Sequence, residues 1–188
     1  MDKIPGIASN IYSDAATLIQ QADILLICAG AGIGVDSGLP DFRGDHGFWK
    51  AYPVFEQEGL TFMDLANPQG FKTNAKRSWG FYGHRYQLYN QTVPHDGFQT
   101  LMKWCSLKNN SSFVFTSNVD GHFQKSGFHE SQVLECHGSI NHLQCAGEFG
   151  RPCLGIWPAV NDSVLQSLII DTKRLTAQPP LPRCRRCQ

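Results

Sequence analysis

The sequence lacks an excess of either charge and lacks any long apolar run. Its 188 residues include 16 basic and 16 acidic side chains, so the formal net charge at pH 7 is +0. A protein that binds nucleic acid or an anionic membrane normally shows a basic patch, and a membrane-spanning helix needs roughly 20 apolar residues in succession. The first residues also lack the apolar core of a signal peptide. We therefore expect a soluble, cytoplasmic protein with neither nucleic acid nor a membrane as partner.

A complete disulfide framework is also missing. The cysteine count is seven, an odd number, and several cysteines gather near the C-terminus, which suits metal thiolates in a reducing compartment better than disulfides. Cys184 and Cys187 have the two-residue spacing of half a zinc site. Because the chain stops directly after this pair and a metal-binding loop normally returns to its domain, we expect the sequence to be incomplete at its C-terminus.

Helix and strand patterns alternate along the sequence. A helical period is expected at 11–22 and at 76–90, where aromatic residues recur at helical spacing, and a further helix follows Pro94. Apolar runs at 23–29, in SSFVFTSNVDG and in SQVLECHGS predict three strands, the first of which is apolar on both faces as buried parallel strands are. This order predicts an α/β fold, a Rossmann-like parallel sheet with helices on both faces, plus a small zinc-binding module.

Ligands of open parallel sheets bind beyond the carboxyl ends of the strands. The predicted strands end at Gly30, at the segment that begins with Ser117, and at His137. We therefore expect these three ends to converge on one site. Residues 1–139 would form the Rossmann-like catalytic part, and residues 140–188 a partial zinc-binding module, with the later strands of such a sheet missing.

The first strand runs into a glycine-rich stretch, CAGAGIGVDSGLPDFRG, predicted to form a loop over 30–47. Backbone without Cβ atoms lets peptide N–H groups approach a pyrophosphate. The dehydrogenase fingerprint G-x-G-x-x-G fails, because Val35 and Ser37 occupy the sixth positions counted from Gly30 and Gly32; a glycine-rich turn without a ligand is the alternative. The Asp-Phe-Arg triplet suits cleavage between nicotinamide and ribose, since a ring can exclude water and an arginine can hold phosphate.

With these motifs the sequence resembles the sirtuins, the family of NAD-dependent protein lysine deacylases. The resemblance rests on GAGIGVDSGLPDFR, on TSNVDGHFQKSG at 116–127, on the dipeptide that begins at His137, and on the paired cysteines that follow. These motifs occur in the family's order and extend over nearly the whole chain from residue 23. Two positions depart from the family pattern, because Gly34 replaces a common Ser and Ser117 replaces a Gln that binds the ribose.

The resemblance implies NAD as the cofactor. Phe42 would cover the nicotinamide end, Arg43 would reach the ribose-phosphate side, and Asn118 would line the nicotinamide pocket. His137 would be the general base that accepts a proton from a ribose hydroxyl, and the implied catalytic residues are His137 and Asn118. Imidazole titrates near neutral pH, which suits this role. The full implied cofactor-binding set is Gly30, Ala31, Gly32, Ile33, Asp41, Phe42, Arg43, Ser117, Asn118, Asp120 and His137.

The family also implies a zinc-binding module after the His-Gly motif. Cys145 and Cys153 would join Cys184 and Cys187 as the four thiolate ligands of Zn²⁺. Seven residues separate the first pair, so the intervening AGEFGRP must bulge outward. The alternative is four reduced surface cysteines. The three other cysteines have apolar neighbours that predict burial in the core: Cys28, Cys105 and Cys136.

Tyr82 and Arg85 lie three positions apart on a predicted helix and therefore on one face. In sirtuins of the desuccinylase and demalonylase type (class III), a Tyr-x-x-Arg pair at the corresponding place binds the acyl carboxylate. Arginine would supply a charge-assisted hydrogen bond and tyrosine a hydroxyl. The alternative is a core tyrosine beside a solvated arginine.

The resemblance thus implies an NAD-dependent lysine deacylase that removes acetyl groups, succinyl and malonyl groups, or both kinds. Its partner would be an acyl-lysine protein or peptide, and its products would be nicotinamide and O-acyl-ADP-ribose. Two alternatives stay open. The same loop and base could serve an NAD glycohydrolase or ADP-ribosyltransferase, and a truncated chain could be a non-catalytic zinc-and-nucleotide module.

Overall fold

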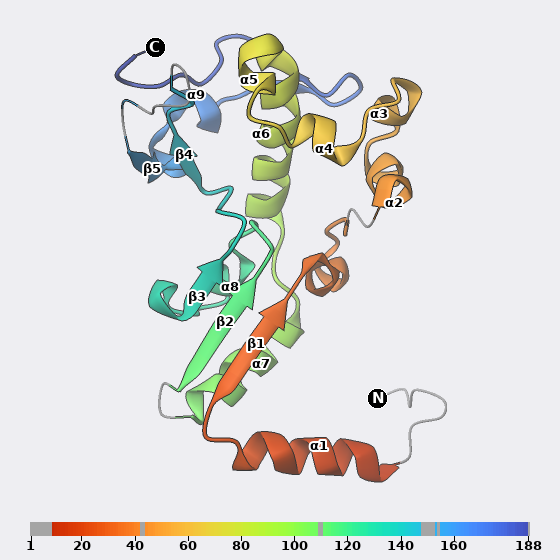
Figure 1. Ribbon diagram of the computed structural model, residues 1–188, viewed down its shortest axis with the longest axis vertical. Coiled ribbons are helices and arrows are strands. Elements are labelled where there is room, and N and C mark those ends of the chain that lie inside the picture. Colours follow the sequence, from red (N-terminus) through yellow and green to blue (C-terminus); the bar gives the residue numbers. More distant parts are fainter. Residues whose placement is uncertain (1–8, 42–43, 109–110, 148–152, 154, 188) are drawn as a thin grey trace.

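The computed structural model describes residues 9–41, 44–108, 111–147, 153 and 155–187. The sheet and most of the helices are shown in Figure 1. The elements in chain order are α1 (Ser9–Gln21), β1 (Leu25–Ala29), the 3₁₀ helix η1 (Ala31–Ser37), α2 (Gly44–Ala51), α3 (Pro53–Gln57), α4 (Phe62–Leu65), α5 (Gly70–Thr73), α6 (Ala75–Gln91), α7 (Asp96–Ser106), β2 (Ser112–Thr116), α8 (His122–Lys125), η2 (Glu130–Gln132), β3 (Val133–Glu135), β4 (His142–Gln144), β5 (Ile156–Pro158), η3 (Ala159–Asn161), α9 (Ser163–Gln166), β6 (Ile170–Asp171) and β7 (Thr176–Ala177).

Three parallel strands form the main sheet, in the order β1-β2-β3. The register pairs Leu25 with Ser112 and Val114 with Val133. Two smaller antiparallel pairs, β4 with β5 and β6 with β7, follow in the chain. The parallel pairing of strands separated by helices confirms the predicted α/β fold class.

Helices α7 and α8 lie behind the sheet in the view of Figure 1 and cover one of its faces. Phe98 and Cys105 of α7 and Phe123 of α8 pack in one buried cluster with Val114 of β2. Val114 is 1% exposed. One face of the sheet is therefore a packed core, as the sequence predicts.

The opposite face of the sheet is open in the described part of the chain. Leu26, Phe115 and Leu134 are 63%, 43% and 47% exposed, so the strands alternate between covered and open residues instead of being buried on both faces. Cys28 and Cys136 are exposed as well. Their predicted burial in the core is therefore wrong, whereas Cys105 is buried as predicted.

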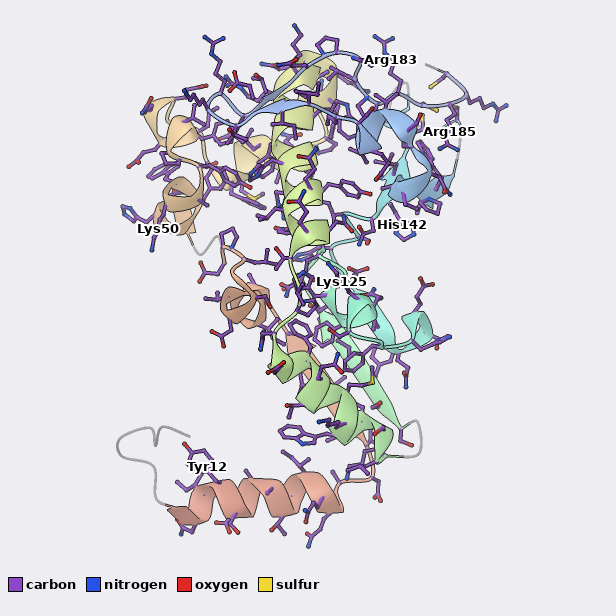
Figure 2. The ribbon with its side chains drawn as sticks, turned by 180° about the vertical axis from the view of Figure 1, so that it is seen from behind. Tyr12, Lys50, Lys125, His142, Arg183 and Arg185 are labelled. Carbon is purple, nitrogen blue, oxygen red and sulfur yellow. The ribbon has the colours of Figure 1, made fainter. Side chains whose placement is uncertain are left out.

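The first helix, α1, was expected at 11–22 and runs from Ser9 to Gln21. Its apolar residues Ile11 and Leu18 are exposed, although the pattern predicts a packed face. Figure 2 shows Tyr12 on this helix, far from the long helix α6.

Helix α6 is the scaffold of the upper part of the molecule, between α2–α5 on one side and β4, β5 and α9 on the other (Figure 1). Phe81 of α6 packs with Phe48 and Phe55, and Tyr86 packs with Leu165. With 17 residues it confirms the helix expected at 76–90. Within the described ranges, no helix is long and apolar enough to cross a membrane.

The glycine-rich stretch contains more regular structure than predicted. The expected loop over 30–47 includes η1 and the first turn of α2. Gly38 ends η1 with φ of 88°, a left-handed conformation that glycine adopts without a Cβ clash, and its N–H donates to the carbonyls of Gly34 and Val35. Short i to i+3 bonds thus organise backbone that the glycine content alone predicts to be irregular.

Candidate functional site

Hydrogen bonds tie the strand ends together at the carboxyl edge of the sheet. The Asn118 side-chain Nδ2 donates to the Gly30 carbonyl at 3.0 Å, and the Ser117 N–H donates to the Ala29 carbonyl at 3.1 Å. The Cys136 N–H donates to the Thr116 carbonyl at 2.9 Å. The glycine stretch, the loop after β2 and the segment after β3 therefore meet, as the parallel topology predicts.

The loop after β2 is held rigidly from both of its ends. The Asp120 carboxylate accepts a hydrogen bond of 2.9 Å from the His122 N–H at the start of α8. The Ile140 N–H donates to the Val119 carbonyl at 2.9 Å. Lys125, the last residue of α8 and labelled in Figure 2, donates its Nζ to two carbonyls at the end of α6. These bonds fix the strand ends relative to α6.

A cavity of about 1740 Å³ lies between α6, the strand ends and the C-terminal segment. Ligand pockets commonly measure roughly 300–1,000 Å³, so this one has room for a dinucleotide and a second substrate together. The predicted site residues that line it are Ala31, Asp41, Tyr82, Arg85, Ser117, Asn118, Asp120, His137, Cys145, Cys184 and Cys187. The structure thus brings the predicted acyl-binding pair and the predicted general base to one cavity.

Of the other predicted cofactor residues that the structure describes, Gly30, Gly32 and Ile33 are not part of the cavity lining. Gly30 contributes its carbonyl to Asn118, and Ile33 packs beside the cluster under the sheet. The Ile33 carbonyl lies 2.9 Å from His95 Nε2. Gly32 precedes Ile33 in η1. Phe42 and Arg43 lie outside the described residues.

Arg85 is buried in a cage of aromatic rings, with 7% of its surface exposed. The carbon of its guanidinium lies 5.5 Å from the Phe62 ring centre, 5.2 Å from that of Phe81 and 5.3 Å from that of Tyr89. Its Nε donates to the Tyr89 hydroxyl at 3.0 Å. Stacking of this kind suits arginine, whose planar cation interacts with aromatic faces. The alternative of a solvated arginine at this position is therefore wrong.

Tyr82 lies beside this cage on the cavity wall. Its ring stacks on Phe71 with ring centres 5.3 Å apart. Burial raises the pKa of Tyr82, and the charge of Arg85 offsets part of that rise. Tyr82 is consequently a neutral hydroxyl near a buried cation, which is the chemistry that recognises a carboxylate.

The four predicted zinc ligands form one cluster. The sulfurs of Cys145, Cys153, Cys184 and Cys187 all lie within 4.8 Å of one another, and three of the sulfur pairs are 3.5, 3.6 and 3.5 Å apart. A tetrahedral zinc ion with Zn–S bonds of about 2.3 Å holds its sulfurs about 3.8 Å apart. The spacing and the all-sulfur donor set therefore fit Zn²⁺.

The protonation of the cluster is uneven. Hydrogen bonding from the Cys153 backbone lowers the pKa of Cys145 to about 6. Hydrogen bonding among the thiols, first with Cys153, raises the pKa of Cys187 to about 12. A bound cation would remove this difference between the cysteines, because metal ligation stabilises the thiolate form of each of them. The loop between Cys145 and Cys153 that was expected to bulge lies mostly outside the described residues.

Sequence reasoning missed several residues that shape the cavity. Tyr89 lies four positions after Arg85, a spacing that places both on one helical face, but its place in an aromatic-rich helix suggests core packing alone. Phe62 and Phe71 come from a region without a clear period. No local signal predicts that these rings meet Arg85 and Tyr82.

Comparison with known proteins gives the family. The family model of the Sir2 family matches residues 30–149, more than half of the chain. An NAD-dependent protein deacylase of Mycolicibacterium paratuberculosis is 30% identical over 161 residues, which cover 85% of this chain and 58% of that protein. The mitochondrial NAD-dependent protein deacylase sirtuin-5 of Monodelphis domestica is 30% identical over 140 residues, which cover 73% of this chain and 41% of the relative.

A solved structure shares the fold. The crystal structure of a Sir2 homolog–NAD complex superposes with a TM-score of 0.65 at 24% identity, covering 93% of this chain and 57% of that one. The match to this chain therefore spans 58%, 41% and 57% of the lengths of these three proteins, in the order given. The matched residues 30–149 include the segments that follow the three strands and the predicted general base. By the extent of this match, and as the sirtuin motifs predicted, the chain belongs to the Sir2 family.

Proposed function

We propose that this chain carries the substrate-binding and catalytic residues of an NAD-dependent protein lysine deacylase that prefers acidic acyl groups such as succinyl. The observation that supports this proposal is the single cavity that Arg85, Asn118 and His137 line together. A deacylase needs these three kinds of group at one place: an acyl recognition element, a nicotinamide-side amide and a base. Removal of acetyl groups is part of the proposal as a weaker activity.

The residues at the strand ends fit the cofactor. The cavity offers Asp41, Asn118 and Asp120 as polar groups for an amide and hydroxyls, beside the small Ala31. When bound, NAD supplies the ribose carbon to which the acyl oxygen is transferred and nicotinamide as the leaving group. Asn118 is already oriented by its bond to the Gly30 carbonyl, so it can bind a ligand with little loss of side-chain freedom.

His137 and the acyl-binding pair would divide the remaining work. The His137 imidazole would accept a proton from a ribose hydroxyl, since it is exposed at the cavity wall. The Arg85 guanidinium would pair with the acyl carboxylate, and the Tyr82 hydroxyl would donate a second hydrogen bond. Because Arg85 is buried, this pairing would be screened little by water and salt.

The acyl preference can be tested with Arg85→Met. Loss of a charge-assisted hydrogen bond in a buried site costs about 1.5–3 kcal/mol, so kcat/KM for a succinyl-lysine peptide should fall about tenfold to hundredfold. The value for the matching acetyl-lysine peptide should change little. Steady-state assays on both peptides measure the ratio.

Arg77→Met is the matched control for this experiment. Arg77 lies on the same helix and forms an ion pair of 2.6 Å with Glu58 at the surface. Its loss should leave both activities unchanged. Equal losses on the two peptides in Arg85→Met would contradict the proposed acyl recognition.

The remaining expectations belong to the same proposal. The partner would be an acyl-lysine protein or peptide. The division into a catalytic part, 1–139, and a zinc-binding part, 140–188, is supported by the position of the four-cysteine cluster. A cytoplasmic location rests on the sequence argument from free cysteines.

A further inference from the structure

We propose that Tyr89 is a positioning residue for acyl specificity, because its hydroxyl fixes the orientation of the Arg85 guanidinium in the cavity. This assignment rests on the proposed role of Arg85 in binding an acyl carboxylate. It adds a residue outside the Tyr-x-x-Arg pair to the elements that determine which acyl group the site accepts.

The helix brings the two side chains together. Arg85 and Tyr89 are four residues apart on α6, a spacing at which side chains are neighbours. The Arg85 Nε donates to the Tyr89 hydroxyl oxygen at 3.0 Å. Tyr89 is 5% exposed and Arg85 is 7% exposed, so water competes little for this hydrogen bond.

The aromatic rings around Arg85 act mainly on the position of its cation. Phe62 and Phe81 lie 5.5 and 5.2 Å from its central carbon, and they attract the cation without directing its N–H groups. The Tyr89 hydroxyl adds a directional contact at one edge of the planar group. The rings therefore hold the cation in place, and the Tyr89 hydroxyl gives the guanidinium a directional contact at its Nε edge.

The orientation matters because arginine presents its donors in a rigid fork. With Nε bonded to Tyr89, a bidentate pairing with a carboxylate would use the two terminal Nη atoms. An acyl carboxylate would then have to approach the guanidinium from the side of its two terminal nitrogens. Loss of the hydroxyl would allow other orientations without removing the charge.

Tyr89 also connects the acyl side of the cavity with the strand ends. Burial raises the pKa of Tyr89, while the charge of Arg85 and its hydrogen bond lower it and the charge of Asp120 raises it. The Tyr89 backbone carbonyl lies 3.4 Å from His122 Nε2. The Tyr89 side chain thus contacts Arg85 while its backbone contacts the start of α8.

The test is Tyr89→Phe, which keeps the ring and removes the hydroxyl. We expect KM for a succinyl-lysine peptide to rise about tenfold with a smaller change in kcat, because carboxylate positioning is a binding effect. Kinetics with an acetyl-lysine peptide should stay unchanged. In an Arg85→Met background, Tyr89→Phe should have no further effect, since the two residues act through one contact.

Tyr86→Phe is the matched control. Tyr86 lies on the same helix, is buried, and loses a different hydrogen bond, the one of 2.8 Å that its hydroxyl accepts from Gln166. The ratio of KM for the succinyl-lysine peptide to KM for the acetyl-lysine peptide should not change in this variant. A similar shift in both variants would show a general loss of packing and would overturn the assignment.

The outcomes separate this inference from the proposed function. If wild-type protein prefers succinyl-lysine and Tyr89→Phe keeps that preference, the positioning role is wrong and the proposed function stands. If wild-type protein and Arg85→Met treat the two peptides alike, the proposed acyl recognition fails and the role of Tyr89 fails with it. Should Tyr89→Phe not fold, the Arg85 Nε–H resonance in wild-type protein replaces it, identified by its loss in Arg85→Lys: slow hydrogen exchange supports the contact and rapid exchange overturns it.

Discussion

His122 is a titratable side chain buried completely beside the site, with 0% exposure. Its Nε2 lies 3.4 Å from the Tyr89 carbonyl, and its Nδ1 has no hydrogen-bond partner within the described chain. Burial lowers the pKa of His122, while Asp120 raises it and Lys125 and His95 lower it. The folded state therefore prefers the neutral ring.

This preference predicts a pH dependence of stability. The pKa of His122 in the folded state lies below the unfolded value of about 6.5. The neutral His122 ring therefore contributes its full stabilisation of the folded state above about pH 6.5, and this contribution is lost as the pH falls through the folded pKa. The Phe side chain in His122→Phe cannot be protonated. When the pH falls from about 7.5 to about 5.5, the free energy of unfolding, measured with urea, should therefore decrease less in this variant than in wild type. Equal losses in the two proteins would contradict the prediction.

At the residue scale, the sequence predicts pairs on one helix better than contacts between elements. Spacing alone places Tyr82 and Arg85 on one face of a helix, and the structure puts both on the cavity wall. The burial of Arg85 depends on Phe62, which comes from another helix. A local pattern carries no information about such a partner.

Helix α6 and strand β7 approach each other closely, and Gly80 makes this possible. A Cβ at Gly80 would collide with the backbone of Leu175 and would lie 2.7 Å from the Thr176 Cα. Glycine inside a helix normally costs about 1 kcal/mol relative to alanine. The glycine at position 80 therefore reflects the close packing of α6 against β7.

Gly80→Ala should accordingly destabilise the protein, although alanine favours helices. We expect a loss of about 1–3 kcal/mol in the free energy of unfolding, the range for overpacked sites. Gly155→Ala is the control, because among the described residues other than its chain neighbours no atom lies within 4 Å of a Cβ placed there. A stabilising Gly80→Ala in chemical unfolding would show that the approach of α6 to β7 is looser than described.

The four-cysteine cluster predicts a structural role for zinc in the segment that follows β3. Purified protein should contain about one zinc per chain, and a chelator should remove it together with some stability, because metal binding is coupled to folding. Hydrogen exchange should rise in β4 and β5, which neighbour Cys145 and Cys153, and stay unchanged in β1. Cys184→Ser should behave like the chelated protein; a zinc-free protein with full protection in β4 would contradict this.

At the element scale, the sequence predicts the number and order of the three parallel strands and the two long helices after the glycine stretch. It does not predict which face of the sheet is covered. Leu26 and Ile27 are equally apolar in the sequence, yet Leu26 is 63% exposed whereas Ile27 packs in the core cluster. Which face is covered depends on elements that are distant in the sequence, so the apolar residues of a strand do not predict it.

In the molecule as a whole, α6 and the strand ends line one cavity, which carries the residues proposed for the acyl group and for the cofactor. Residues from well-separated segments meet there, among them Arg85, Asn118 and His137. The carboxyl-edge rule for parallel sheets predicts the meeting of Asn118 and His137. The position of α6 across that edge follows from packing on both of its sides.

The most direct test is the release of nicotinamide from NAD with and without a succinyl-lysine peptide. We expect release that depends on the peptide, equals the amount of lysine freed, and disappears in His137→Ala. His129→Ala is the control, since His129 is exposed and bonds to Ser131 at the surface. Release without peptide would indicate a glycohydrolase or transferase, and no release under either condition would indicate a non-catalytic chain; both results would contradict the account.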